Sequence, residues 1–210
     1  MAIAALSNFT VPLASDQSAS SQGMLMPKLK YRFRISFENF GVSTPTTELT
    51  KQVAEAARPK VEFENQTIDI YNSKVYFAGK PKWSPIVIKL RDDVTNAVSK
   101  LVGEQNQKQF DFFEQSSAAS AGDYKFTMRI EILDGGNGTS TPNVLETWIC
   151  YGCYIQSTNW NDLKYSEQGP AMIDLSIQFD NAVQAPSELA IGSPTSVQTN
   201  RGNNTNALGG

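Results

Sequence analysis

Apolar and polar residues alternate along several stretches of this chain, and this alternation is the strongest structural signal in the sequence. Over residues 30–38 the apolar positions that share one face are Tyr31, Phe33, Ile35 and Phe37. Charged and small polar residues occupy the positions between them, so this period of two predicts a half-buried strand. The same pattern predicts three more strands, over residues 124–133, 145–154 and 171–179.

A long extended stretch, residues 57–93, carries apolar surface that one compact domain would not cover. Pro59 removes a donor for sheet pairing and biases Arg58 towards extended geometry. The apolar residues that follow it and need a partner are Val61, Phe63, Ile68, Ile70 and Tyr71. Together with Pro59 they are candidates for an arm between subunits. This pattern is typical of a subunit that is built to assemble.

The later part of that stretch also has the pattern of a β-hairpin. Residues 74–78 and 83–90 are rich in β-branched and aromatic side chains, which favour strands. Gly79, Lys80 and Pro81 stand between them and have the chemistry of a turn. We therefore expect these two strands to pair with each other.

A helix is predicted to follow Asp92 and Asp93, one of which is placed to cap its N-terminus. Capping is favoured over a paired-carboxylate acid because the two residues directly precede a helical pattern. The apolar residues on one face of the helix are Val94, Ala97, Val98, Leu101 and Val102. Gly103 is expected to end or interrupt the helix, with a second helical piece over residues 104–115.

The aromatic residues allow two interpretations each. For Phe110, Phe112 and Phe113 we favour packing in the core under the helix over docking of a partner protein. The three tryptophans are expected to anchor the core or an interface rather than to form a sugar-binding platform, and they are Trp83, Trp148 and Trp160.

Seven or eight strands around one helical insertion predict a mainly β fold, a β-sandwich or rolled barrel with an α-helix packed on it. At 210 residues the chain is long enough for one domain with a sizeable core. We place that domain at residues 28–183, between an N-terminal extension over residues 1–27 and a C-terminal extension over residues 184–210. Both extensions are rich in small and polar residues and show no sustained period.

The composition argues against an enzyme. The sequence contains no histidine, which removes the usual general base near neutral pH, the usual nitrogen ligand of zinc, and every Ser-His or Cys-His nucleophile pair. Nothing marks a pair of carboxylates of the glycosidase kind. We therefore expect no catalytic residues, no metal and no cofactor.

The net charge of −3 does not draw the protein onto nucleic acid or anionic membrane, and no apolar run approaches the ~20 residues that span a bilayer.

Cys150 and Cys153 form a lone C-x-x-C pattern. A zinc site needs four ligands, and the chain has no further cysteine and no histidine to supply them. On a regular strand the two side chains would point to opposite faces. We therefore expect buried free thiols without a redox or metal role.

Two other patterns have ordinary explanations. The DGGNG segment that begins at Asp134 lacks the Gly-Lys-Ser/Thr ending of a phosphate-binding loop and opens no helix, so it predicts a hairpin turn. Basic residues alternate with the aromatic residues of the first strand, and they are Lys28, Lys30, Arg32 and Arg34. Because these cations lie on the face opposite the rings, a solvated or subunit-pairing face is favoured over nucleic-acid binding.

Two longer segments show a resemblance to a known family. They are ARPKVEF with IDIYNSKVYFAGKPKWSPIVIKLRDD and, after the helix, LETWICYGCYIQSTNWNDLKYSEQGPAMIDLSIQFDNAV. In this order they resemble the tail tube protein of contractile-tailed bacteriophages of the T4-like type, over about residues 28–183. The resemblance favours a strand for residues 48–57, where Leu49, Val53 and Ala56 also fit a short helix.

The resemblance implies a six-fold ring whose strands join between subunits into one continuous barrel, with rings stacked head to tail into a hollow tube inside a contractile sheath. Closing a ring would pair exposed strand edges, and a heterologous contact that does not close propagates into a filament. It also implies that the stretch after the first strands is a long loop that reaches a neighbouring subunit. The implied partners are further copies of the chain, sheath, baseplate and tail-terminator proteins, and DNA in transit without specific binding, with no membrane. The implied location is the virion, after assembly in the host cytoplasm.

A conduit must let DNA slide, and a lumen lined with lysine or arginine would hold it through repeated phosphate contacts. We therefore predict an acidic or polar lumen, with Glu55 and Asp162 as candidate residues. Other readings remain open: the inner tube of a tailocin or type VI-like secretion machine, a tube-initiating baseplate protein, or, from a different class, a lectin-like β-sandwich binding module.

Overall fold

The computed structural model describes residues 27–43, 46–135 and 142–186. It divides into two compact units, Met1–Arg32 and Phe33–Gly210, which are treated separately below. In the first unit the described residues contain a turn, in which the Arg32 N–H donates to the Leu29 carbonyl at 3.2 Å. The Arg32 guanidinium lies 5.5 Å from the centre of the Tyr31 ring. The first strand therefore begins at Phe33, and its prediction from residue 30 was too long.

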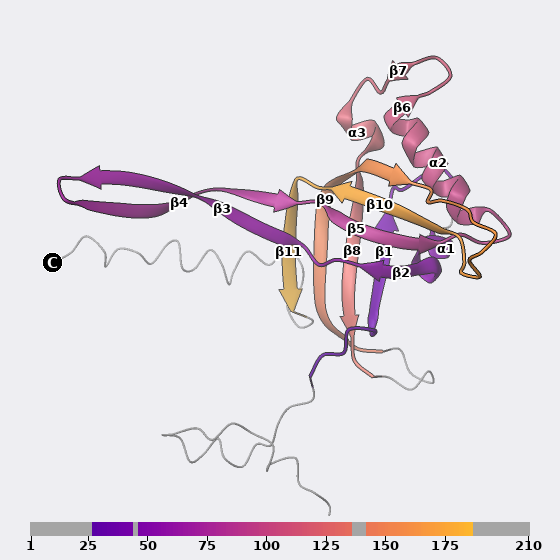
Figure 1. The fold of residues 1–210 in the computed structure, drawn as a ribbon, viewed down its shortest axis with the longest axis horizontal. Helices are drawn as coiled ribbons and strands as arrows, with labels where there is room; N and C mark the ends of the chain where they lie inside the picture. Colours follow the sequence, from indigo (N-terminus) through magenta and orange to yellow (C-terminus); the bar gives the residue numbers. More distant parts are fainter. Residues whose placement is uncertain (1–26, 44–45, 136–141, 187–210) are drawn as a thin grey trace, which may run out of the picture. The chain divides into compact units, whose positions relative to one another are not determined.

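A seven-stranded antiparallel sheet forms the second unit (Figure 1). Its strands are β1 Phe33–Glu38, β2 Val53–Ala56, β5 Ile86–Arg91, β8 Phe126–Leu133, β9 Val144–Asn159, β10 Met172–Gln178 and β11 Asn181–Pro186. They run in the order β1-β8-β9-β10-β5-β2, and β11 pairs with β9. This arrangement confirms the predicted mainly β fold. The strand β11 continues past residue 183, the last residue of the predicted domain.

The long strand β9 belongs to both halves of this sheet. Its first part, up to Cys153, pairs with β8, while its last part, Tyr154 to Asn159, pairs with β10. Between them Gly152 adopts a left-handed φ of 65°, and the register of β8 against β9 shifts. In Figure 1 the strands β10, β5 and β2 run across β9, β8 and β1. One hydrophobic core fills the space between the two halves.

The bulge near Gly152 also places both cysteines in the core. A regular strand would direct Cys150 and Cys153 to opposite faces, but the added residue turns both inward, and both are free thiols with no exposed surface. The Cys153 Sγ lies 3.3 Å from the Cys150 carbonyl oxygen. Burial raises the pKa of each thiol to about 12. The prediction of buried free thiols is thus confirmed, and the prediction of opposite faces was wrong.

The principal helix, α2, runs from Ala97 to Gln109 as one continuous element. Gly103 neither ends nor interrupts it, so the prediction of two helical pieces was wrong. The N-cap position is Asn96 rather than Asp92 or Asp93. The Asp93 carboxylate nevertheless accepts the Ala97 N–H at 3.0 Å, and Asp92 accepts the Ser99 hydroxyl at 2.9 Å. Both aspartates therefore stabilise the start of the helix from outside the cap position.

Residues 48–57 contain both of the elements that the sequence allowed. The helix α1, Thr47–Gln52, buries Leu49 completely, and β2 follows it directly. The strand that the family resemblance favoured is therefore only the second half of this stretch. A third helix, α3, covers Ala121–Tyr124 and is closed by a capping box between Ser120 and Asp123.

The core brings α2 against both halves of the sheet. Helix α2 contributes Val98, Leu101 and Val102, and the sheet contributes Ile35, Ile88, Met128, Leu175 and Ile177. Three rings form a cluster at the end of β1, where the ring of Phe40 lies 5.2 Å from that of Phe37 and 4.9 Å from that of Phe126.

Residues 136–141 of the predicted DGGNG turn lie outside the described residues. On either side of them, the Asp134 N–H donates to the Asn143 carbonyl at 2.9 Å.

Candidate assembly interface

The predicted arm is a β-hairpin rather than an unpaired loop. Strand β3, Lys60–Ile70, pairs with β4, Ser73–Ser84, in a two-stranded sheet of their own (Figure 1). The chain reverses at Tyr71, whose φ is 42°, an unusual conformation for a bulky residue. This hairpin, called the arm below, replaces the predicted pairing of residues 74–78 with residues 83–90. Strand β5 pairs instead with β10 and β2.

A bulge divides the arm where the sequence predicted a turn. Phe63 pairs with Pro81 and Asn65 with Ala78, so β4 contains an additional residue at this point. A Cβ atom on Gly79 would lie 2.8 Å from the Glu64 carbonyl oxygen, which explains why glycine stands there. Gly79 and Pro81 therefore mark a bulge within a continuous strand. The bulge separates an outer half, residues 65–78, from the arm root, residues 58–63 and 80–84.

The apolar side chains of the arm change faces across this bulge. In the outer half they share one face because Ile68 pairs with Val75 and Gln66 with Phe77. In the root the apolar face contains Val61, Phe63, Pro81 and Trp83. Side-chain exposure is 56% for Phe63, 52% for Ile68 and 50% for Phe77. Large apolar residues with half of their surface in water, gathered on one element, mark an interaction surface.

All of the predicted arm residues lie on or next to this hairpin. Val61, Phe63, Ile68 and Ile70 lie on β3, Tyr71 is fully exposed at the tip, and Pro59 is half-buried just before β3. Sequence reasoning missed Val75 and Phe77, which complete the outer apolar face. Their alternation with Lys74 and Tyr76 was visible, but the apparent turn at Gly79 assigned them to another hairpin.

Charged residues on the arm are partly paired. Lys60 forms an ion pair with Glu62 at 2.5 Å, and Lys74 one with Asp69 at 3.4 Å. The pKa of Glu62 is lowered mainly by the hydrogen bond from Lys60. The positive charges of Lys60 and Lys82 lower it further. Lys80 and Lys82 form no ion pair with any described residue. The arm root therefore presents excess positive charge beside its apolar face.

The two predicted lumen residues lie on different elements. Glu55 on β2 forms an ion pair with Lys89 on β5 at 2.9 Å, and Asp174 is the register partner of Lys89 on its other side. The hydrogen bond from Lys89 to Glu55 raises the pKa of the lysine. Asp162 lies in the exposed connection between β9 and β10, away from regular structure.

The segment after α2 corrects the prediction for the three phenylalanines. Two short strands, β6 Phe110–Asp111 and β7 Ser116–Ser117, form a small hairpin that we call the aromatic turn (residues 110–117). Phe112 is 65% exposed and Phe113 is 95% exposed, so neither packs in the core. The tryptophans are divided: Trp83 packs on Phe179 at 5.4 Å, whereas Trp160 is exposed. Trp148, like Trp83, is partly buried against the core, so two of the three tryptophans anchor the core.

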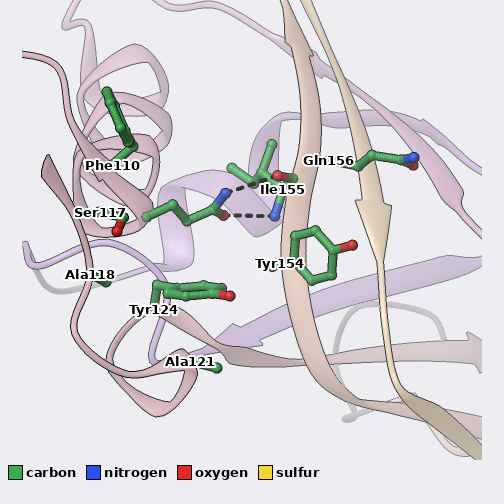
Figure 2. Close-up of a pocket in the computed structure, with 9 residues that line it drawn as sticks. Phe110, Ser117, Ala118, Ala121, Tyr124, Tyr154, Ile155 and Gln156 are labelled. Atoms are coloured by element: carbon green, nitrogen blue, oxygen red, sulfur yellow. Dashed lines mark hydrogen bonds between the residues drawn. The ribbon is translucent and has the colours of Figure 1, made fainter. Parts of the chain in front are cut away.

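A pocket of about 420 Å³ lies between the end of α2, the segment around α3 and strand β9 (Figure 2). Its lining contains Tyr124 and Tyr154, whose rings meet edge to face at 6.4 Å, and no charged side chain. These groups offer hydrogen bonds and aromatic surface but no nucleophile with a neighbouring base. Among the described residues no three His, Cys, Asp or Glu side chains are grouped to hold a metal ion.

Comparison with known proteins identifies the fold. No protein-family model and no curated protein matches the sequence. A chain of the anti-feeding prophage cap, a tube-terminating cap, superposes with a TM-score of 0.58 at 12% identity, over 84% of this chain and 99% of the other. A chain from the PVC sheath/tube terminator, in the extended state of an extracellular contractile injection system, gives 0.55 at 12% identity, over 78% and 99%. A chain from the PVC sheath-tube complex gives 0.55 at 11% identity, over 82% and 99%.

The chain has the fold of these contractile injection system proteins. This agreement is one of fold, and the three structures named here are parts of a prophage tube-terminating cap and of an extracellular contractile injection system. The matches cover almost all of each injection-system chain and leave part of the present chain outside. Within the described residues no helix is both long and apolar enough to cross a membrane.

Proposed function

We propose that this protein is a structural subunit of the tube of a contractile injection machine. In the form that the sequence resembles, the machine is a contractile phage tail, and hexameric rings of the chain stack head to tail inside a sheath. The tube would be a conduit through which DNA passes without specific binding, and the chain would carry no catalytic residue. The likeness of fold to proteins of sheath-tube and terminator assemblies supports this function.

The observation that carries the proposal is the exposed apolar arm. One copy leaves the outer face of Ile68, Ile70, Val75 and Phe77 about half exposed, and no described element covers it. A monomer that stayed monomeric would keep this surface in water, at a cost of about 25 cal/mol for each Å² that assembly could bury. Packing the arm on another copy removes that cost. The arm candidates Pro59, Val61, Phe63 and Tyr71 would contribute to the same contact.

Open strand edges support a ring. Strands β1, β2 and β11 each have a single strand neighbour in the described sheet, which leaves backbone donors and acceptors on their other sides. Strands joining between neighbouring copies would satisfy these groups and close the ring. A ring with two unlike faces then stacks into a filament, because a heterologous contact repeats without closing.

The paired charges on β2 and β5 support a conduit that does not grip DNA. Glu55 pairs with Lys89, so this ion pair itself would offer a phosphate group little free positive charge. Asp162 would add negative charge if its connection lines the same space. Partners would be further copies of the chain, a sheath protein, and baseplate and terminator proteins.

Negative-stain electron microscopy of the concentrated protein, with and without a preformed baseplate, tests the proposal. We expect hollow rings or tubes of uniform diameter. A protein that remains monomeric even on a baseplate would rule out a tube subunit. A terminating cap is the second candidate, because two of the matched chains come from terminator structures. A cap would form single rings that bind the end of a tube and do not stack further.

A further inference from the structure

The aromatic turn is closed by hydrogen bonds and exposes apolar surface. The Asp111 Oδ1 accepts the N–H groups of Phe113 at 2.9 Å and Glu114 at 3.1 Å, which fixes the reversal of the chain. These hydrogen bonds lower the pKa of Asp111, and the bond from the Glu114 N–H contributes most to this shift. The rings of Phe110 and Phe112 meet edge to face at 5.4 Å. In this hydrogen-bonded turn Phe112 and Phe113 remain exposed to water.

This turn is also acidic. From Gln109 to Tyr124 the chain contains Asp111, Glu114 and Asp123 and no lysine or arginine. Exposed aromatic residues flanked by carboxylates fit a partner surface that is apolar with a basic rim. Such a partner surface is present elsewhere on this chain.

The arm root has the complementary character. It contains Arg58, Lys60, Lys80 and Lys82 against a single acid, Glu62. Arg58, Lys80 and Lys82 form no ion pair with a described residue, and Phe63 and Pro81 form an exposed apolar pair beside them. The lysines lie on or near the face opposite Phe63, but a two-stranded ribbon has an edge on each side that no further described strand covers. Long lysine side chains can therefore reach a partner on either face.

The two surfaces do not cover each other within one copy, because Phe113 and Phe63 both remain exposed. We propose that the aromatic turn of one copy docks on the arm root of a second copy. Phe112 and Phe113 pack on Phe63 and Pro81, and Glu114 meets Lys80 and Lys82. This inference rests on the proposed function, because it names the surface that receives the arm. The contact is heterologous, so each copy gives one turn and one arm to different neighbours.

Charge reversal of the full-length chain tests this contact. Lys82→Glu and Glu114→Lys are prepared separately, and association is measured by sedimentation and electron microscopy, in solution and on a preformed baseplate. We expect each variant alone to need about tenfold higher concentration than the wild type for half-association. Mixing the two variants should restore association, because each reversed arm then meets a reversed turn. Raising the salt concentration should weaken wild-type association.

A second arm variant and a pair of control variants complete the experiment. Lys80→Glu provides a second arm variant, because Lys82→Glu faces Glu62 across the ribbon and could loosen the hairpin. The matched control mixes Lys51→Glu with Glu167→Lys, which reverse exposed charges outside both surfaces. Each control variant should associate like the wild type, and mixing should change nothing.

The outcomes separate the inference from the proposed function. Tubes that form equally well from every variant would overturn the turn-to-arm contact and leave the tube subunit intact. Association that follows the charge reversals but never produces rings or tubes, even on a baseplate, would support the contact and overturn the tube. A wild type that does not associate under any condition would overturn both.

Discussion

The side-chain amide of Gln109 pairs with the backbone of Ile155 as a neighbouring strand would. Its Nε2 donates to the Ile155 carbonyl at 2.9 Å, and its Oε1 accepts the Ile155 N–H at 2.8 Å (Figure 2). Strand β8 pairs with β9 only as far as Cys153, so beyond that point no described strand pairs with the α2 side of β9. One glutamine at the end of α2 therefore completes the sheet where a strand is missing.

Replacing this glutamine should loosen the second half of β9. Gln109→Leu leaves a backbone donor and an acceptor of Ile155 unpaired in a half-buried site, and we expect a loss of about 2 kcal/mol in the free energy of unfolding. Denaturant titration measures it. Gln107→Leu is the matched control, since that side chain is exposed on the same helix. Equal stability of the two variants would show that the paired amide contributes nothing.

Two glycines should respond to alanine in opposite directions. At Gly152 a Cβ atom would lie 2.1 Å from the Asp180 Oδ2, and φ is 65°. Gly152→Ala should cost about 2 kcal/mol or more, and should displace Asp180 from its ion pair with Lys125. Gly103 in α2 meets nothing within 4 Å, so Gly103→Ala should stabilise by about 0.5–1 kcal/mol. Thermal and denaturant unfolding measure the stability of the two variants. A change of the same sign in the free energy of unfolding of both would contradict this prediction.

Glu104 should give the fold a specific dependence on acid. This carboxylate on α2 accepts the Ser43 hydroxyl at 2.6 Å and the N–H groups of Ser43 and Val42. These bonds, with the charge of Lys100, lower its pKa from the usual 4.5 to about 2. The folded state therefore binds fewer protons than the unfolded state between these values. The stabilisation is complete above about pH 4.5 and is lost as the pH falls towards 2.

The measurement compares the wild type with Glu104→Gln over this pH range. Because the carboxylate is only 20% exposed, the variant should lose up to about 3 kcal/mol near neutral pH, and the difference should vanish near pH 2. Glu48→Gln on the exposed surface of α1 is the control and should show little difference at any pH. A gap between wild type and Glu104→Gln that stays constant with pH would contradict the assigned role.

The outer half of the arm should affect assembly and not folding. Ile68→Asp or Phe77→Asp places a charge on the apolar face, so we expect rings or tubes to disappear. The free energy of unfolding of the monomer should stay within about 0.5 kcal/mol, because these residues lie outside the core. Thr67→Asp, on the other face of the same strand, is the control and should assemble. Tubes that form normally from Ile68→Asp would exclude this face as the contact.

The Glu55–Lys89 pair should limit the retention of DNA by assembled tubes. Glu55→Lys removes the acid that neutralises Lys89 and adds a second cation, repeated in every copy along the tube. We expect variant tubes to retain more DNA in co-sedimentation at low salt, with retention lost as salt rises. Glu48→Lys provides the same charge change on α1. Equal retention by both variants would place Glu55 away from the conduit.

Alternation was sufficient to predict the strands that have one buried face. β1, β8 and β10 all show it, because each contributes every second side chain to the core. The pairing of the arm was not predictable in the same way. Gly79 and Pro81 fit a turn and a bulge equally well, while the true reversal at Tyr71 lacks the glycine that usually marks one.

The polar contacts were even harder to predict from the sequence. Gln109 and Gln105 complete backbone hydrogen bonds of other elements, but glutamine is common in helices and no spacing identifies its partner. The one available signal was Gln105, which follows Leu101 by one helical turn and so falls on the buried face. The exposed turn at Phe112 and Phe113 was missed for a related reason, since aromatic composition alone favours the core.

The shared strand β9 has a mechanical consequence. Because β8 and β11 pair with its first part and β10 with its last, a pull that separates the two halves of the sheet must stretch one continuous polypeptide. Covalent bonds carry that tension, whereas two separate strands would transmit it through side-chain packing alone. A load applied to one half of the sheet therefore reaches the other half through the backbone of β9.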